Sequence, residues 1–221
     1  MKKKYLILVL AVAAVAAAGA GTSLALHTDE SARLVNTISE KTLGVTEKSK
    51  IQDEIKVNPG SAIDLNYSVF NDGGSDNTNG SYDIYAKVFV YYGFENVQTD
   101  KDSPVQLNID VDGEPIRLDK YIYSYDDQYR AGDWIVTYFD DEQIVLYYTK
   151  PLAYGETSSE FLSSMKFDKD MGNEFSGQSF LIESSVDAVQ TNCGKSAIAA
   201  EWGVYPDFDG NGNITYISEE L

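Results

Sequence analysis

Near the end of the chain, oxygen-bearing side chains recur at every second position, with glycines between them. They are Asp207, Asp209, Asn211 and Asn213. Carboxylate and amide oxygens at this spacing are typical ligands of Ca²⁺ in loops of the Asp-x-Asp-x-Asn-Gly type, where glycine permits tight curvature. The sequence therefore predicts a candidate calcium site at these four residues.

The same stretch has a second interpretation, as the tip of a β-hairpin. Ser218 stands at the twelfth position, where a calcium loop of this type has a bidentate glutamate, and Glu219 comes one position late. Asp, Asn and Gly are also the usual residues of tight turns. Residues 204–205 and 214–217 would then be the paired strands. The two interpretations are compatible, because a hairpin tip can also bind calcium.

Closely spaced tyrosines supply another pattern that could bind a ligand. They are Tyr121, Tyr123, Tyr125 and Tyr129, and period-two spacing places the first three on one face of a strand. The strip predicts either a surface that stacks on sugars or, more simply, a half-buried sheet face or an edge that packs against another subunit.

Alternating apolar and polar residues beyond residue 55 predict the strands that must position these groups. The predicted strands cover residues 63–69, 84–91, 105–111, 115–118, 134–139, 144–150 and 180–190. Turn residues at 112–113 and 140–143 predict two hairpins. A helical pattern is found only at Ser158 to Met165 and at Lys195 to Trp202. The fold class that follows is all-β, an antiparallel β-sandwich with one or two short helices.

The first 25 residues have the three parts of a signal peptide. Lys2 to Lys4 are basic, an apolar run follows, and Ser23-Leu24-Ala25 offers the small-x-small pattern that a signal peptidase reads. A membrane anchor is the competing interpretation, since the run is long enough to span a bilayer as a helix. We expect cleavage after Ala25, a secreted protein, and contact with a membrane only through an uncleaved signal.

The signal-like residues and the strand pattern predict three parts of the chain. These are a signal peptide over 1–25, an N-terminal strand and mobile connection over 26–56, and a β-sandwich domain over 57–221. The strand is expected at Leu34 to Val45, and the connection over 46–56 is rich in charge and poor in pattern.

The exported part is strongly acidic. Removal of residues 1–25 takes away three of the 17 basic residues and none of the 35 acidic ones, which leaves 14 against 35 and a net charge of −21. Such a surface argues against nucleic acid and anionic lipid as partners. A single cysteine, Cys193, excludes an intramolecular disulfide and favours export from a bacterium with one membrane.

Several short motifs stand in order along nearly the whole chain. They are Gly21-Thr22-Ser-Leu-Ala25, Val57-Asn-Pro-Gly60, Tyr67-Ser-Val-Phe-Asn71-Asp-Gly73, Tyr147 to Thr157, Val186-Asp-Ala-Val-Gln190 and Ala200-Glu-Trp202-Gly203. Together they resemble the TasA and camelysin family of exported proteins, whose signals are cut by a SipW-type signal peptidase. The resemblance implies a jelly-roll-like sandwich.

For the best-known members the resemblance also implies assembly into fibres of a biofilm matrix, in which an N-terminal strand is donated to the next subunit. Residues Leu34 to Val45 would be the donated strand, and an unpaired sheet edge is a ready site for it. The expected partners are therefore the signal peptidase and the protein itself or a related matrix protein.

Camelysin-type members have been described as metallopeptidases, but the residues here argue against catalysis. A zinc peptidase needs histidine ligands, commonly as His-Glu-x-x-His, and this chain has only His27. A Ser-His-Asp site would have to use His27, which lies in the expected mobile terminus two residues past the predicted cut, and Cys193 has no plausible histidine partner. The acidic pairs at 126–127 and 140–141 could mimic a glycosidase, although adjacent carboxylates on turns are usually only solvated.

The sequence thus predicts a structural protein of the cell surface or extracellular matrix, not an enzyme, and no cofactor other than the candidate calcium. The alternative is a secreted adhesin or binding module, stiffened by calcium, that recognises a sugar or a protein. A camelysin-like metallopeptidase comes third.

Overall fold

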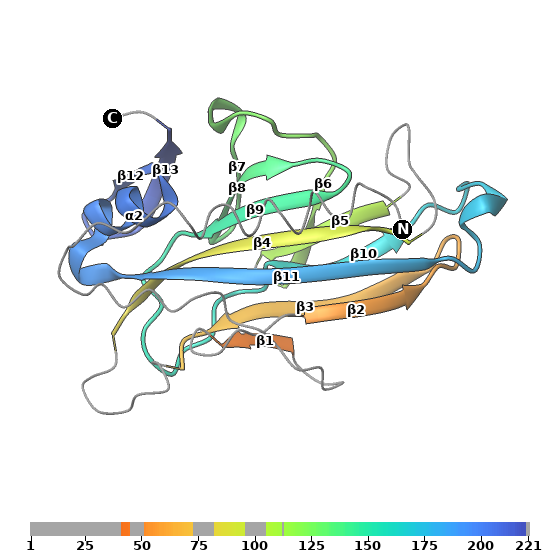
Figure 1. Ribbon diagram of the computed structural model, residues 1–221, viewed down its shortest axis with the longest axis horizontal. Coiled ribbons are helices and arrows are strands. Elements are labelled where there is room, and N and C mark those ends of the chain that lie inside the picture. The colour runs from red at the N-terminus through yellow and green to blue at the C-terminus, as the bar shows by residue number, and fades with distance from the viewer. Residues whose placement is uncertain (1–40, 45–50, 73–81, 96–104, 112, 220–221) are drawn as a thin grey trace, which may run out of the picture.

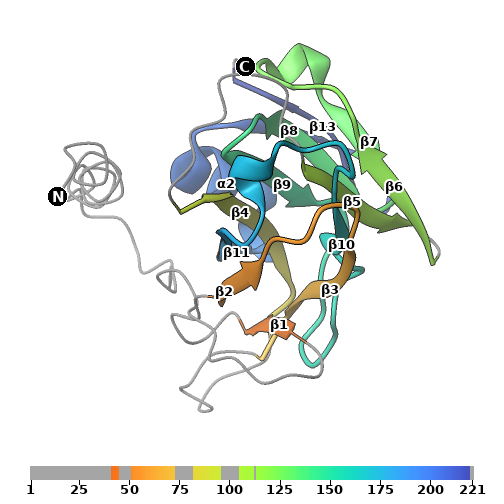
Figure 2. The same cartoon turned by 90° about the vertical axis from the view of Figure 1, so that its right-hand side faces the viewer.

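The computed structural model describes residues 41–44, 51–72, 82–95, 105–111 and 113–219, and its two large β-sheets face each other (Figures 1 and 2). The five-stranded sheet has the order β1-β3-β10-β5-β6, and the six-stranded sheet has the order β2-β11-β4-β9-β8-β7. The all-β sandwich expected from the sequence is confirmed. Signal residues Ser23 and Ala25 lie outside the described residues.

The bounds of the strands in the five-stranded sheet are β1 Lys41–Gly44, β3 Ala62–Phe70, β10 Leu162–Phe167, β5 Val105–Val111 and β6 Glu114–Leu118. Those in the six-stranded sheet are β2 Ile51–Lys56, β11 Ser179–Gln190, β4 Ile84–Phe94, β9 Gln143–Tyr148, β8 Trp134–Phe139 and β7 Tyr129–Ala131. A third, two-stranded sheet pairs β12 Tyr205–Phe208 with β13 Ile214–Ser218. The helical segments are η1 Tyr125–Asp127, η2 Asn173–Phe175, η3 Thr191–Cys193 and α2 Gly194–Trp202.

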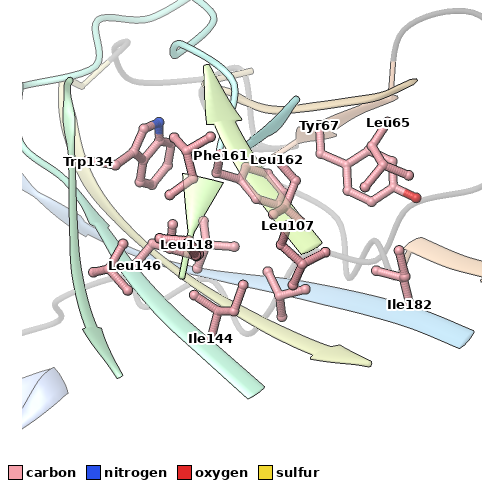
Figure 3. Close-up of a cluster of buried hydrophobic side chains, with 14 of the residues drawn as sticks. Leu65, Tyr67, Leu107, Leu118, Trp134, Ile144, Leu146, Phe161, Leu162 and Ile182 are labelled. Carbon is pink, nitrogen blue, oxygen red and sulfur yellow. The ribbon is translucent and has the colours of Figure 1, made fainter. Parts of the chain in front are cut away.

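The main core lies between the two large sheets (Figure 3), and every second side chain of the strands β4, β5 and β9 points into it. On β3 the inward residues are Leu65, Tyr67 and Val69, all buried. Trp134 and Phe161 are fully buried, and their rings meet nearly edge to face at 5.8 Å. Burying a side chain of this size stabilises a fold by about 1.5–3 kcal/mol relative to leaving it exposed.

Both predicted hairpins are confirmed, and local hydrogen bonds explain their turns. Asp110 Oδ1 accepts a bond of 2.6 Å from the N–H of Gly113, which has φ of +82° and begins the return into β6. Asp140 Oδ1 accepts bonds of 2.8 Å from the N–H groups of Glu142 and Gln143, which closes the β8–β9 turn. Turn chemistry of this kind acts over a few residues and is readable from sequence.

A second apolar cluster lies on the outer face of the six-stranded sheet. Tyr85, Ile135 and Tyr147 point away from the main core and are nearly inaccessible to solvent. The C-terminal residues cover them, chiefly Ile198 of α2 and Ile214 of β13. Figure 1 shows this C-terminal group, α2 with β12 and β13, gathered at one end of the sheet. The sheet is therefore covered on both faces at that end.

Two expected elements differ in the structure. The helix expected over Ser158 to Met165 is wrong, because β10 occupies its second half and pairs with β3 on one side and β5 on the other. A six-residue window with serines at its centre fits either period, and backbone pairing on both sides decides for a strand. The helix expected over Lys195 to Trp202 is confirmed as α2.

The unpatterned connection expected over residues 46–56 is wrong for its last six residues, which form β2. β2 lies at the edge of the six-stranded sheet and pairs in antiparallel register with β11. Its exposed Glu54 accepts hydrogen bonds from Ser179 Oγ at 2.6 Å and Lys56 Nζ at 2.9 Å. Because an edge strand can carry charged residues and still pair with its neighbour, the sequence of β2 lacks the usual alternation of apolar and polar residues.

Candidate functional site

The N-terminal strand β1 occupies the edge of the five-stranded sheet (Figure 2). It runs parallel to β3, with Lys41 opposite Tyr67 and Gly44 opposite Phe70. The other described strand pairs are antiparallel. The strand expected over Leu34 to Val45 is thus confirmed for residues 41–44, and its other residues lie outside the described part of the chain. Its partner here is its own chain.

On the side away from β1, β3 pairs with β10, and a network around Asn71 holds the end of β3. Asn71 directly follows the strand and is only 1% exposed. Its side-chain amide donates to the carbonyls of Tyr82 at 2.8 Å and Leu152 at 2.9 Å. Its backbone N–H donates to the Glu156 carbonyl at 3.0 Å, and its carbonyl accepts from Gly155 at 2.7 Å. The strand that receives β1 is therefore fixed from its other side, and Asn71 has a structural role.

Asp209 closes the turn between β12 and β13. Its Oδ1 accepts bonds of 2.8 Å from the N–H groups of Asn211 and Asn213, and its Oδ2 accepts one of 2.8 Å from the side-chain amide of Asn213. The bonds from Asn213 and Asn211 hold the pKa of Asp209 below its ordinary value. The hairpin interpretation is confirmed by this pairing.

The calcium interpretation of the same loop stays a prediction. Both Asp209 oxygens already accept hydrogen bonds from the loop, and the exposed Asp207 lies 3.8 Å from Lys195 Nζ. Among the residues that the structure describes, no group of three or more His, Cys, Asp or Glu side chains is placed to hold a metal ion.

Tyrosines gather around the acidic turn of the β8–β9 hairpin. Tyr138 donates a hydrogen bond of 2.7 Å to Asp140 Oδ2, Tyr92 donates to the Asp140 carbonyl, and Tyr121 donates to Asp141 Oδ1. The bond to Asp140, with a smaller contribution from burial, raises the pKa of Tyr138 to about 12. Burial, followed by the charge of Asp140, raises the pKa of Tyr92. Both aspartates of this turn therefore accept bonds from tyrosine hydroxyls.

The predicted strip of tyrosines is only partly assembled. Tyr121 and Tyr123 flank Ile122, whose backbone bridges that of Phe139, and their rings meet edge to face at 6.0 Å. Tyr123 is 65% exposed. Tyr125 does not continue the strip, because Ser124 caps the 3-10 helix η1 and turns the chain away.

The remaining members of that pattern are also separate from the strip. Tyr129 is the first residue of β7, and Asp126 and Asp127 lie in η1. Asp126 accepts a bond of 3.2 Å from the Tyr216 hydroxyl.

A pocket of about 870 Å³ lies beside the tyrosines. Its deeper lining consists of buried Tyr92, Leu118 and Phe139. Half-buried Tyr121 forms part of the wall. Sequence reasoning missed this site, because its lining comes from β4, β5, β6, the end of β8, residues 119–121 and residues 168–171, which are distant along the chain.

Two opposite charges lie partly buried on the outer face of the six-stranded sheet. Lys87 on β4 is in register with Asp187 on β11. The Lys87 Nζ lies 4.6 Å from the ring centroid of Phe89 and 5.4 Å from that of Tyr147. Burial lowers the pKa of Lys87 and raises that of Asp187, and each partner's charge opposes the shift of the other. Desolvation is therefore the dominant electrostatic effect here.

In comparisons with known proteins, no protein family, curated protein or solved structure matches the chain. Within the described residues, no helix has the length and apolar character needed to cross a membrane. Functional inference therefore depends on the geometry described above.

Proposed function

We propose that this protein is an exported structural protein of the cell surface or extracellular matrix, of the TasA and camelysin type, that assembles by N-terminal strand donation. The observation that carries the proposal is β1, a four-residue strand from the start of the exported chain that lies in parallel on the edge of β3.

Strand donation needs an edge whose partner can be exchanged at little cost. β1 makes only a short ladder, and the same strand from a neighbouring subunit would make the same backbone bonds to β3. A contact in which each subunit gives a strand to the next is heterologous, so it extends into a filament unless the rotation closes a ring.

Export is supported by the signal-like residues 1–25, with cleavage after Ala25 by a SipW-type peptidase. The expected net charge of −21 after cleavage supports solubility outside the cell. Because like charges repel, attraction between copies must come from backbone pairing. The expected partners are another copy of this chain or a related matrix protein. In this proposal the protein is not an enzyme, which agrees with its single histidine, His27.

Electron microscopy of the exported form, beginning at residue 26, tests the proposal. A double variant, Thr42→Pro with Leu43→Pro, removes two successive N–H groups of β1. One of them must face β3, because successive N–H groups of a strand point to opposite sides, so the variant should abolish filaments. Thr42→Val with Leu43→Val is the matched control and should retain them. Circular dichroism should show the β-sandwich in both variants, since β1 contributes only four residues at the sheet edge. Filaments of unchanged number and length in the double proline variant would refute strand donation.

A further inference from the structure

The geometry points to a binding site for a neutral polysaccharide in the pocket between β5, β6 and residues 168–171. Its volume of about 870 Å³ lies within the range of roughly 300–1,000 Å³ that is usual for ligand sites. Polysaccharides combine apolar ring faces with hydroxyl groups that donate and accept hydrogen bonds. The pocket offers surfaces for both.

Aromatic rings form one side of the site. Tyr92, Tyr121 and Phe139 line the pocket, and Tyr121 meets Phe139 edge to face at 5.6 Å. Tyr123 extends this surface beyond the pocket lining, because the residue is 65% exposed and its ring centroid lies 6.0 Å from that of Tyr121. A sugar ring in the pocket would thus have a neighbouring ring position over Tyr123.

The aromatic rings are held in place before any ligand arrives. The hydroxyls of Tyr92 and Tyr121 donate to the turn at Asp140 and Asp141. Tyr138, which donates to the same turn, packs edge to face against Tyr123 at 5.9 Å. A surface fixed in this way loses little conformational entropy on binding.

Charges of both signs surround the pocket. Arg117 and Lys120 are exposed donors, and Asp119, Asp168 and Asp170 are acceptors. Because the two signs nearly balance, the pocket selects neither a strong anion nor a strong cation. A neutral ligand with many hydroxyls satisfies donors and acceptors together.

The pocket and the donated strand are separate. The five-stranded sheet has β6 at one edge and β1 at the other. Glycan binding by a monomer and filament formation by β1 can therefore fail independently.

Affinity electrophoresis of the exported form tests this site. The gels contain hydroxyethylcellulose, xylan, galactomannan or dextran, and polygalacturonate serves as the anionic comparison. Tyr123→Ala and Arg117→Gln alter the site. Tyr154→Ala and Lys195→Gln are matched controls, because both side chains are exposed and neither lines the pocket.

At least one neutral polysaccharide should retard the protein. The apparent dissociation constant should rise about tenfold in Tyr123→Ala, where an aromatic contact is lost, and in Arg117→Gln. The controls should stay within about twofold of the parent. Retardation by none of the four neutral polymers, retardation by polygalacturonate alone, or equal loss in the controls would overturn the assignment.

Discussion

Replacement of a buried serine by alanine should have opposite effects on stability at Ser184 and Ser158. Ser184 lies on β11, is 0% exposed, and its Oγ has no hydrogen-bond partner among the described residues. Ser158 is 7% exposed, but its Oγ accepts a bond of 3.0 Å from the Val69 N–H and donates one of 2.7 Å to the Ser159 carbonyl.

The expected magnitudes follow from these partners. An unsatisfied buried polar group costs about 1–3 kcal/mol, so Ser184→Ala should raise the free energy of unfolding by about 1 kcal/mol. Ser158→Ala leaves the Val69 N–H without its acceptor and should lower that free energy by about 1–3 kcal/mol. A change of 1 kcal/mol corresponds to about 2–4 °C in Tm for a protein of this size.

Urea unfolding followed by tryptophan fluorescence measures both changes, with equal m-values as the check that only stability has changed. The two substitutions delete the same atom from the same residue type, so each is the control for the other. A lower urea midpoint in Ser184→Ala, or shifts of the same sign in both variants, would refute this reasoning about the interior between the sheets.

Further predictions concern the charged groups of the outer surface and turns. Asp140 raises the pKa of Tyr138 to about 12, so Asp140→Asn should move this pKa toward its ordinary value of 10.0, as measured by tyrosinate absorbance. The raised pKa favours the neutral phenol in the folded state. Its contribution to stability is therefore complete below pH 10 and is lost as the pH rises through about 12. Lys87→Met should lower the free energy of unfolding by about 1–2 kcal/mol, because Asp187 loses its cross-strand partner. In urea titrations, the double variant Lys87→Met with Asp187→Asn should recover at least half of that loss. Asp209→Ala should speed hydrogen exchange of the β12–β13 amides while the global urea stability changes by less than about 0.5 kcal/mol.

The hairpins were predictable because their determinants are local. Asp140 caps its own turn, and Gly113 adopts a positive φ that other residues rarely tolerate, so a few letters of sequence carry the information. The strands β3, β4 and β11 were also predictable from their own residues, because a buried face imposes an alternation of apolar and polar side chains along each strand.

What could not be predicted depends on contacts between distant segments. β10 was mistaken for a helix because its pairing with β3 and β5 overrides a weak local pattern. The pocket has no local signal, because its lining converges from β4, β5, β6, β8 and two loops. Apolar residues on both faces of β4, such as Tyr85 beside Ala86, hinted at the second core but did not identify the C-terminal residues that cover it.

Disulfide trapping in filaments tests strand donation most directly. In a Cys193→Ala background, Thr42→Cys and Ser68→Cys occupy paired positions of β1 and β3, at a strand spacing that a disulfide can bridge. Lys41→Cys with Ser68→Cys is the control, one residue out of register. Strand donation predicts that oxidised filaments of the paired variant give a ladder of covalent oligomers on denaturing gels, which reductant returns to monomer. Oxidised filaments that run only as internally crosslinked monomers would contradict it.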